Sequence, residues 1–332
     1  MIKRSISILL CIIMIATMGM CLCACDGSDS DNFPVNINGI TINEEPKNIV
    51  VLSSEHADII SYIGYDVKMV GKSSECDHEY FKRVPSVGFE AAPDVDAIIS
   101  LKADLVITAS TLSKEAQKKL SDNNITVVNV ALAKKFSDTK KMYETLGMIL
   151  GGNKTGKEKG LEAYNELFEM LKEFEVSVPK DIITTACYLY IGDNGKLCTF
   201  TKDSVEYNTF SYCGAKNTLA TQQTPEVDIE KFKFTTPSYI FYDNEAVLNM
   251  LSANTELASM DAIENNNLMQ IKKSDFRHLG ITFYDTIYDM MDFMFFKNAS
   301  KDEATPDVAS QVSTQDSTST PSEESVENFT IE

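Results

Sequence analysis

Histidine is the side chain in this sequence best suited to bind a transition metal, and it occurs at only three positions. His56, His78 and His278 each lie in or beside a short polar segment that follows or borders a predicted strand. In parallel α/β folds such loops open on a crevice where ligands bind. An imidazole there would ligate the iron or cobalt of a bound complex. Each histidine taken singly is equally well explained as an exposed or packing residue, and three so scattered give little support for a bare zinc site.

Other side chains near the same loops suit the recognition of a bulky ligand. Arg277 borders the loop of His278, and aromatic residues nearby would provide flat contact area with a polar tip. A single tyrosine is nevertheless more often part of a core. The predicted ligand-contacting residues are Ser54, Glu55, His56, His78, Phe89, Tyr190, Tyr242, Arg277 and His278.

The sequence contains no convincing catalytic motif. G-x-S-x-G and H-E-x-x-H are absent. Residues 151–158 mimic a phosphate-binding loop, but Glu158 stands where a metal-binding Ser or Thr is needed, and a helical pattern precedes the segment. An interhelical turn explains these residues better, and we predict that the protein is not an enzyme.

Two similar helix-strand units would position the candidate residues. In residues 93–108, a proline and two aspartates precede a helical apolar pattern and then the run Leu105-Val106-Ile107. A short apolar run without alternation suggests a parallel strand that is covered on both faces. Residues 225–242 repeat this pattern. The chain is therefore predicted to contain two lobes that are built alike.

Predicted strands and helices alternate along both halves of the chain, which indicates an α/β fold. Between the halves, apolar residues at three- and four-residue steps predict a long amphipathic helix that Pro179 ends. The predicted division is a signal peptide at 1–25, a spacer and N-terminal arm at 26–45, an N-terminal α/β lobe at 46–152, a linking helix at 153–178, a C-terminal α/β lobe at 179–298 and an acidic tail at 299–332.

The first residues have the layout of a bacterial lipoprotein signal. Lys3 and Arg4 precede an apolar run, and Leu22-Cys23-Ala24-Cys25 follows it. Small or apolar residues before the cut fit a signal peptidase, and the thiol of Cys25 would accept the lipid. The alternative is an uncleaved membrane anchor, although the run is short for a span. Either reading places the body outside the cytoplasm and tethers it to a membrane.

Charge and cysteine content narrow the function further. The net charge of −19 argues against nucleic-acid binding. Part of it, −7, lies in the Ser/Thr-rich residues 299–332, which lack the apolar content to fold and are predicted to be disordered. Cys76, Cys187, Cys198 and Cys213 show no CxxC pairing, so a metal cluster is not indicated. A disulfide among the last three and buried free thiols both remain open.

The order and spacing of these blocks resemble the ABC-importer substrate-binding proteins for ferric siderophores, haem or cobalamin, the helical-backbone class III of periplasmic binding proteins. Three segments carry the resemblance: Pro46-Lys47-Asn48-Ile49-Val50-Val51-Leu52-Ser53, residues 87–106, and residues 225–242. It extends from about Pro46 to Phe296. It implies two Rossmann-like βαβ lobes, each with a mostly parallel sheet, joined by one long α-helix. Such a helical linker is stiff, so the lobes would shift only slightly on binding.

The resemblance also implies a function. The protein would capture a ferric chelate, haem or cobamide between its lobes as cargo, with no resident cofactor or metal, and would act as a monomer. It would deliver the cargo to ABC permease subunits driven by a cytoplasmic ATPase. Scarce arginine favours a cargo that is less anionic than a catecholate siderophore, or one whose metal the protein ligates. The alternatives are a surface sensing or adhesion lipoprotein, a receptor for a bare metal ion, and an extracytoplasmic enzyme related to nitrogenase components.

An acid on the outer end of each lobe docks onto the permease in the resembled family. The matching positions here are Asp96 and Glu230. Asp96 departs from the usual glutamate, which shortens its reach. Both acids are also explained as favourable charges near helix N-termini.

Overall fold

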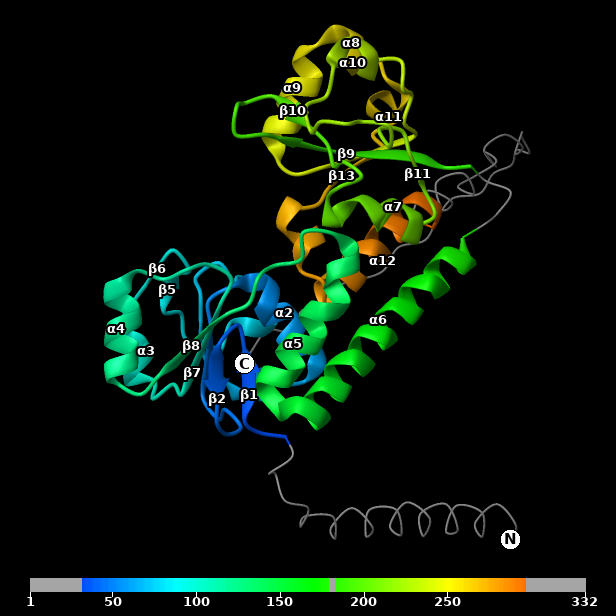
Figure 1. The fold of residues 1–332 in the computed structure, drawn as a ribbon. Helices are drawn as coiled ribbons and strands as arrows, with labels where there is room; N and C mark the ends of the chain where they lie inside the picture. The colour runs from blue at the N-terminus through cyan, green and yellow to red at the C-terminus, as the bar shows by residue number, and fades with distance from the viewer. Residues whose placement is uncertain (1–31, 179–182, 297–332) are drawn as a thin grey trace, which may run out of the picture.

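The computed structural model describes residues 32–178 and 183–296 (Figure 1). The predicted signal peptide, the lipid-accepting Cys25 and the acidic tail at 299–332 lie outside these residues. Within the described residues, no helix combines the length and the apolar character needed to cross a membrane.

The N-terminal lobe is built on a parallel sheet with strand order β4-β3-β7-β8. The strands are β3 (Ile49–Val51), β4 (Met69–Lys72), β7 (Leu105–Thr108) and β8 (Thr126–Asn129). Both central strands, β3 and β7, are buried along their whole length, because helices cover both faces of the sheet. This confirms the parallel, doubly covered strand predicted from Leu105-Val106-Ile107.

The helices of this lobe form two layers. On one face, α2 (Ser54–Ile63) and α5 (Thr139–Gly151) pack with the odd-numbered strand residues Ile49 and Val51. On the other face, α3 (Val95–Ser100) and α4 (Lys114–Asp122) pack with Val50 and Val106. The lobe also has two hairpins, β1 (Val35–Ile37) with β2 (Ile40–Ile42), and β5 (Gly88–Phe89) with β6 (Ala92–Pro93).

One helix start differs from the sequence-based expectation. We predicted that Pro93 would open the helix of residues 93–108, but Pro93 belongs to β6. Asp94 is the N-cap of α3, and its carboxylate accepts a hydrogen bond from the amide of Ala97 at 3.0 Å. The aspartate side chain can satisfy an otherwise unpaired amide, and this fixes where the helix begins.

The C-terminal lobe has a five-stranded, mostly parallel sheet with order β10-β9-β12-β13, and β11 pairs with β9. Its strands are β9 (Thr185–Ile191), β10 (Leu197–Cys198), β11 (Lys216–Asn217), β12 (Tyr239–Tyr242) and β13 (Leu268–Gln270). Only β10 runs antiparallel to its neighbour within this sheet as described. The helices are α7 (Thr209–Tyr212), α8 (Ile229–Phe232), α9 (Glu245–Ala253), α10 (Thr255–Ala258) and α11 (Asp261–Glu264).

A helical layer joins the two sheets. A π-helical turn, Gly152–Gly156, leads from α5 into the long α6 (Lys157–Ser177), which runs from the N-terminal lobe to the C-terminal lobe (Figure 1). A Cβ atom on Gly147 would lie 2.2 Å from the carbonyl oxygen of Gly156, so glycine is needed where α5 and α6 meet. The phosphate-loop mimic is therefore an interhelical turn, as predicted.

The last helix, α12 (Ile281–Phe295), returns to the joining layer and packs against α2 and α6. The buried apolar residues consequently form one continuous cluster from Ile49 in the first sheet to Tyr188 and Phe241 in the second. Each lobe also has one smaller cluster on its outer face.

Cys76, Cys187, Cys198 and Cys213 are all buried free thiols. The disulfide that the sequence left open therefore does not form.

Candidate functional site

A cavity of about 570 Å³ lies between the lobes. The N-terminal lobe contributes the segments that follow β7 and β8, and the C-terminal lobe contributes residues 203–206 and Arg277. In a parallel sheet the carboxyl ends of neighbouring strands meet at one edge, which explains why these loops face one crevice. The lining consists of Ala109, Ala131, Leu132, Ala133, Lys134, Asp203, Ser204, Val205, Glu206 and Arg277.

Arg277 is held between two carboxylates at this crevice. Its Nη1 donates to Oε1 of Glu206 at 3.3 Å, and its Nε lies 3.6 Å from Oε1 of Glu55. Glu206 belongs to the C-terminal lobe and is buried, whereas Glu55 lies in the first turn of α2 in the N-terminal lobe. The guanidinium group therefore bridges the lobes, and the side chains of Glu55, Glu206 and Arg277 form a group that we call the Arg277 triad.

Glu55 is ionised within this triad. Burial by itself would raise its pKa, but a hydrogen bond from its own backbone amide, the charges of His278 and Arg277, and a hydrogen bond from Ser53 lower the pKa below the usual range. The hydroxyls of Ser53 and Ser54 donate to Oε2 at 3.1 and 3.3 Å. Both Glu55 and Arg277 thus take the crevice position that we predicted, although Arg277 is not free.

His78, His278 and Ser54 line a second, much smaller space next to the triad. Its volume of about 10 Å³ is enough for roughly one water molecule. The buried carboxylate of Asp58 lies beside it and accepts hydrogen bonds from Tyr80 and from Oγ1 of Thr282 on α12, the latter at 2.7 Å. Burial raises the pKa of Asp58 despite these bonds. The two histidines therefore border a polar contact between the lobes.

His56 does not face the crevice. Its side chain is 0% exposed on the inner face of α2, and neither ring nitrogen has a hydrogen-bond partner among the described residues. Burial lowers its pKa to about 4, so the ring is neutral at pH 7. The prediction that His56 contacts ligand is wrong for this structure, because the first turn of α2 points the side chain into the core.

Tyr190 and Tyr242 lie on opposite faces of the C-terminal sheet. Tyr242 pairs with Leu189 in the parallel ladder of β9 and β12, so it lies on the face of Leu189 and opposite to Tyr190. Tyr242 packs with the outer cluster of the C-terminal lobe. Tyr190 packs with the continuous cluster, and the ammonium group of Lys273 sits 3.8 Å from its ring centroid. The placement of Tyr242 at the crevice was wrong.

Phe89 is 60% exposed in the β5–β6 hairpin and belongs to neither cavity lining described above. The next residue, Glu90, fixes this hairpin to the end of β7. Its Oε1 accepts hydrogen bonds from Oγ1 of Thr108 at 2.7 Å and from the amides of Ala109 at 2.6 Å and Ser110 at 3.0 Å. The hairpin is thus held beside the crevice by a carboxylate that the sequence analysis did not single out.

The sequence analysis also missed residues 131–134 and 203–206. The β-branched run Thr126-Val127-Val128 is a usable signal for the first segment, since it indicates a strand, and residues after a parallel strand belong to the ligand edge of the sheet. Residues 203–206 had no such signal, because the strand that precedes them, β10, is antiparallel to its neighbour. The structure has a 3-10 turn at Val205–Asn208 before α7, and this turn directs Glu206 toward Arg277.

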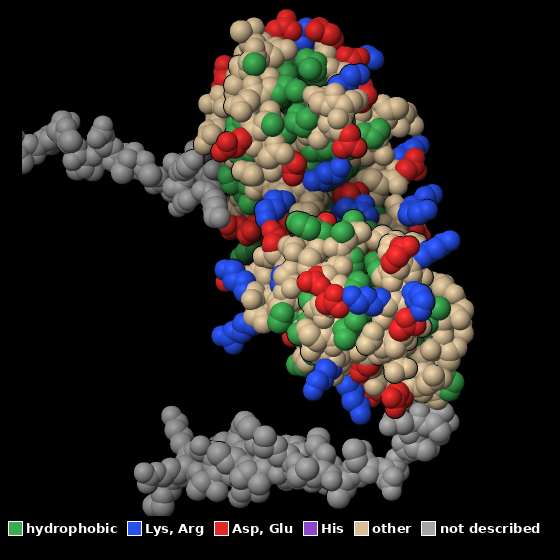
Figure 2. All heavy atoms as spheres, turned by 90° about the vertical axis from the view of Figure 1, so that its left-hand side faces the viewer, with side chains coloured by type: hydrophobic (Ala, Val, Ile, Leu, Met, Phe, Trp, Pro, Cys, Tyr) green, Lys and Arg blue, Asp and Glu red, His purple; other side chains and the backbone are tan. Residues whose placement is uncertain are grey.

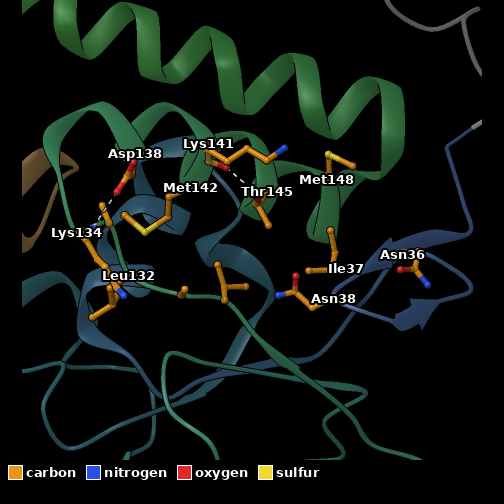
Figure 3. Close-up of a pocket in the computed structure, with 13 residues that line it drawn as sticks. Asn36, Ile37, Asn38, Leu132, Lys134, Asp138, Lys141, Met142, Thr145 and Met148 are labelled. Atoms are coloured by element: carbon orange, nitrogen blue, oxygen red, sulfur yellow. Dashed lines mark hydrogen bonds between the residues drawn. The ribbon is translucent and has the colours of Figure 1, made fainter.

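A third cavity of about 540 Å³ lies on the other side of residues 131–134. It is bounded by the β1–β2 hairpin and α5, and Figure 3 shows Ile37, Leu132 and Met142 around it. Lys134 closes one end, where its amide donates to Asp138 at 3.2 Å. Residues 131–134 therefore form a strap between this groove and the crevice.

Asp96 and Glu230 lie at the outer ends of the lobes, on α3 and α8 (Figure 1). Each side chain is 78% exposed. Asp96 pairs with Lys119 of α4 at 2.6 Å, and Glu230 pairs with Lys233 at 2.8 Å. Figure 2 shows acidic and basic side chains interspersed over both lobes on the face it presents. Among the described residues, no group of three or more His, Cys, Asp or Glu is placed to hold a metal ion.

Comparison with known proteins gives consistent matches. Residues 49–274 match the family model described as periplasmic binding protein. The ABC transporter substrate-binding lipoprotein YvrC of Bacillus subtilis is 29% identical over 57% of this chain, a match that spans 62% of the relative's length. The petrobactin-binding protein YclQ of the same organism is 23% identical over 74% of this chain and 80% of its own length. The solved haem-binding protein HutB of Vibrio cholerae has a TM-score of 0.62 and 14% identity, over 74% of this chain and 98% of its own.

Proposed function

Because this chain belongs to the periplasmic binding protein family, we propose that it is the extracytoplasmic solute-binding component of an ABC importer. Its cargo is a bulky metal chelate or tetrapyrrole of the ferric siderophore, haem or cobalamin type. The observation that carries the proposal is the cavity of about 570 Å³ between the strand-end loops of both lobes. Pockets for such ligands typically enclose roughly 300–1,000 Å³.

The lining of this cavity suits a large ligand, because it is mostly apolar and contributes only a few fixed polar groups. Small and apolar residues occupy most of it, and the Arg277 triad supplies a polar end. Flat apolar contact gives affinity, and a few placed charges give orientation. Glu55, Arg277, Leu132 and Val205 are the contact residues we propose, with Ser54, His78 and His278 beyond the triad.

The joining layer favours a small movement between lobes when cargo binds. Besides α6, Thr282 of α12 bonds to Asp58 of α2, and the hydroxyl of Tyr143 donates to the carbonyl of Leu279 at 2.6 Å. Both bonds are buried, and breaking them would leave unpaired polar groups. The lobes therefore open by a limited rotation about this layer.

Anchoring and delivery follow from the same proposal. Cys25 carries the lipid that tethers the mature protein, as the lipoprotein names of relatives support. The protein acts as a monomer and docks through Asp96 and Glu230 onto a permease that a cytoplasmic ATPase drives. Replacing Cys25 by Ser should release the protein from the membrane fraction or block its processing; normal retention at the mature mass would contradict this anchor.

Native mass spectrometry and a visible absorption spectrum of the purified protein test the proposal, because ferric chelates, haem and cobamides differ in mass and colour. Ala109→Trp should fill the crevice and abolish cargo binding. Thr145→Trp, which lines only the groove behind the strap, is the matched control and should bind normally. Absence of binding to any chelate or tetrapyrrole, or equal effects of the two variants, would contradict the proposed function.

A further inference from the structure

The crevice carries no surplus of positive charge. Its lining contains two basic side chains, Lys134 and Arg277, and two acidic ones, Asp203 and Glu206. Glu55 reaches Arg277 from the adjoining side of the crevice and adds a third carboxylate. The side chains around a ligand in this space therefore have a net charge that is zero or slightly negative.

Arg277 is already engaged on two sides. Its side chain is 33% exposed, whereas those of Glu206 and Glu55 are 4% and 19% exposed. A guanidinium group that already pairs with two partly buried carboxylates attracts a third anion only weakly. Withdrawing Arg277 from Glu206 would leave a nearly buried carboxylate without its counter-ion, which is strongly unfavourable.

Two neighbouring cations, Lys272 and Lys273, are occupied as well. Lys272 pairs with Asp77 across the lobes at 3.1 Å, and Lys273 lies over the ring of Tyr190. Lys134 and Asp203, the other two charges in the lining, are opposite in sign. An anionic ligand would thus be attracted weakly by the crevice and repelled by the net charge of −1 on the Arg277 triad.

We propose that the crevice selects metal complexes with no net negative charge, and that the Glu55–Arg277–Glu206 triad enforces this selection. The inference rests on the proposed function and narrows its cargo. A neutral or cationic ferric tris-hydroxamate or an amidated corrinoid fits the triad. A ferric tris-catecholate, ferric citrate or haem with two free propionates does not.

The test uses probes that differ only in charge. A linear ferric tris-hydroxamate with a terminal ammonium group carries +1, its N-acetyl form is neutral, and its N-succinyl form carries −1. Cyanocobalamin and its monocarboxylate derivative provide a second pair. Calorimetric titration of the full mature protein should show at least tenfold weaker binding of the anionic member of whichever scaffold binds.

Variants then assign the selectivity to the triad. Glu55→Gln with Glu206→Gln frees Arg277 while preserving shape, and should bring the anionic and neutral probes within about threefold of each other. Arg277→Gln should shift the preference in the opposite direction, toward the cationic probe. The control is Glu158→Gln with Glu169→Gln, which removes two exposed charges from α6 and should leave the ratio unchanged.

Each remaining outcome contradicts the inference in a distinguishable way. If the anionic probe binds as tightly as the neutral one, or if only haem or a ferric tris-catecholate binds, the charge selection is wrong and the proposed function stands. If the triad variants change affinity for all probes equally, the triad supports the fold and does not select. If no chelate, haem or corrinoid binds, the proposed function fails as well.

Discussion

Each lobe contains the same short unit, in which a helix capped by an aspartate leads through a turn into a parallel strand. Asp94 caps α3 by accepting from the amide three residues on, and Asp228 caps α8 by accepting from the amide two residues on. Eight residues after each cap, the chain adopts a left-handed conformation, with φ of 54° at Lys102 and 40° at Thr236. The strands β7 and β12 begin three residues later. The spacing from cap to strand is identical in the two lobes.

The surroundings of the two units differ. In the N-terminal lobe, α4 packs against α3 and supplies Lys119 to Asp96. In the C-terminal lobe, Lys233 from the end of α8 pairs with Glu230 and also with Glu256 of α10. Local sequence thus sets the helix, turn and strand of each unit, whereas the packing of other elements sets the ion pairs of its exposed acid.

The largest expected effect comes from removing both exposed acids at once. Asp96→Arg with Glu230→Arg should abolish cargo uptake by cells while cargo affinity in solution stays unchanged, because reversed charges would repel a basic docking surface. The single variants show which lobe contributes more. Glu158→Arg with Glu169→Arg on α6 is the charge-matched control. Normal uptake by the double variant would remove these acids from the mechanism, and lost cargo binding would place them elsewhere.

The completely buried His56 should make the stability of the N-terminal lobe depend on acidic pH. The pKa of His56 falls from 6.5 in the unfolded chain to about 4 in the folded protein, so the neutral ring stabilises the fold above pH 6.5 relative to lower pH. This contribution, about 3 kcal/mol by linkage, is lost as the pH falls from about 6.5 through 4. His56→Leu should flatten the pH dependence of the free energy of unfolding by about this amount, measured by chemical denaturation. An unchanged pH dependence would show that the ring is not buried as a neutral group.

If the helix-strand units of the two lobes are equivalent, their aspartate caps should contribute equally to the free energy of unfolding. Asp94→Ala and Asp228→Ala should each lower the free energy of unfolding by about 1 kcal/mol, because each removes the acceptor of a helix N-terminal amide. Denaturation of the single and double variants measures this, with Asp122→Ala at the end of α4 as an exposed aspartate that caps nothing at a helix start. Effects that differ by more than about 1 kcal/mol would break the equivalence of the lobes.

The smallest effect is expected at the left-handed turn residues. Lys102→Gly and Thr236→Gly should each raise the free energy of unfolding by about 0.5 kcal/mol, since glycine adopts positive φ without the Cβ penalty but loses more chain entropy on folding. Thr236 should gain more than Lys102, because its Cβ is branched. Thermal unfolding checks the order. Loss of stability at either position would mean that its side chain makes contacts that outweigh the strain.

Sequence patterns were sufficient to predict the helix-strand unit of each lobe. The apolar run at residues 105–107 and its repeat near residue 240 predicted buried parallel strands, and both strands are present. The long helix ending before Pro179 was also predictable, because α6 buries Leu167, Phe168 and Leu171 on one face. These features depend on residues close in the chain, where periodicity and turn chemistry act directly.

The candidate site required the tertiary structure. Whether Tyr190 and Tyr242 share a face depends on the register of β9 against β12, and a shift of one residue reverses the answer. The burial of His56 depends on how α2 is rotated against the sheet. Sequence patterns indicated that the loops of Ser54, His78 and His278 lie near the crevice, but they did not show that residues 131–134 and 203–206 line it. The fold decided that Arg277 would lie between Glu55 and Glu206, because these carboxylates come from distant elements that only lobe packing brings within about 3.6 Å of one guanidinium group.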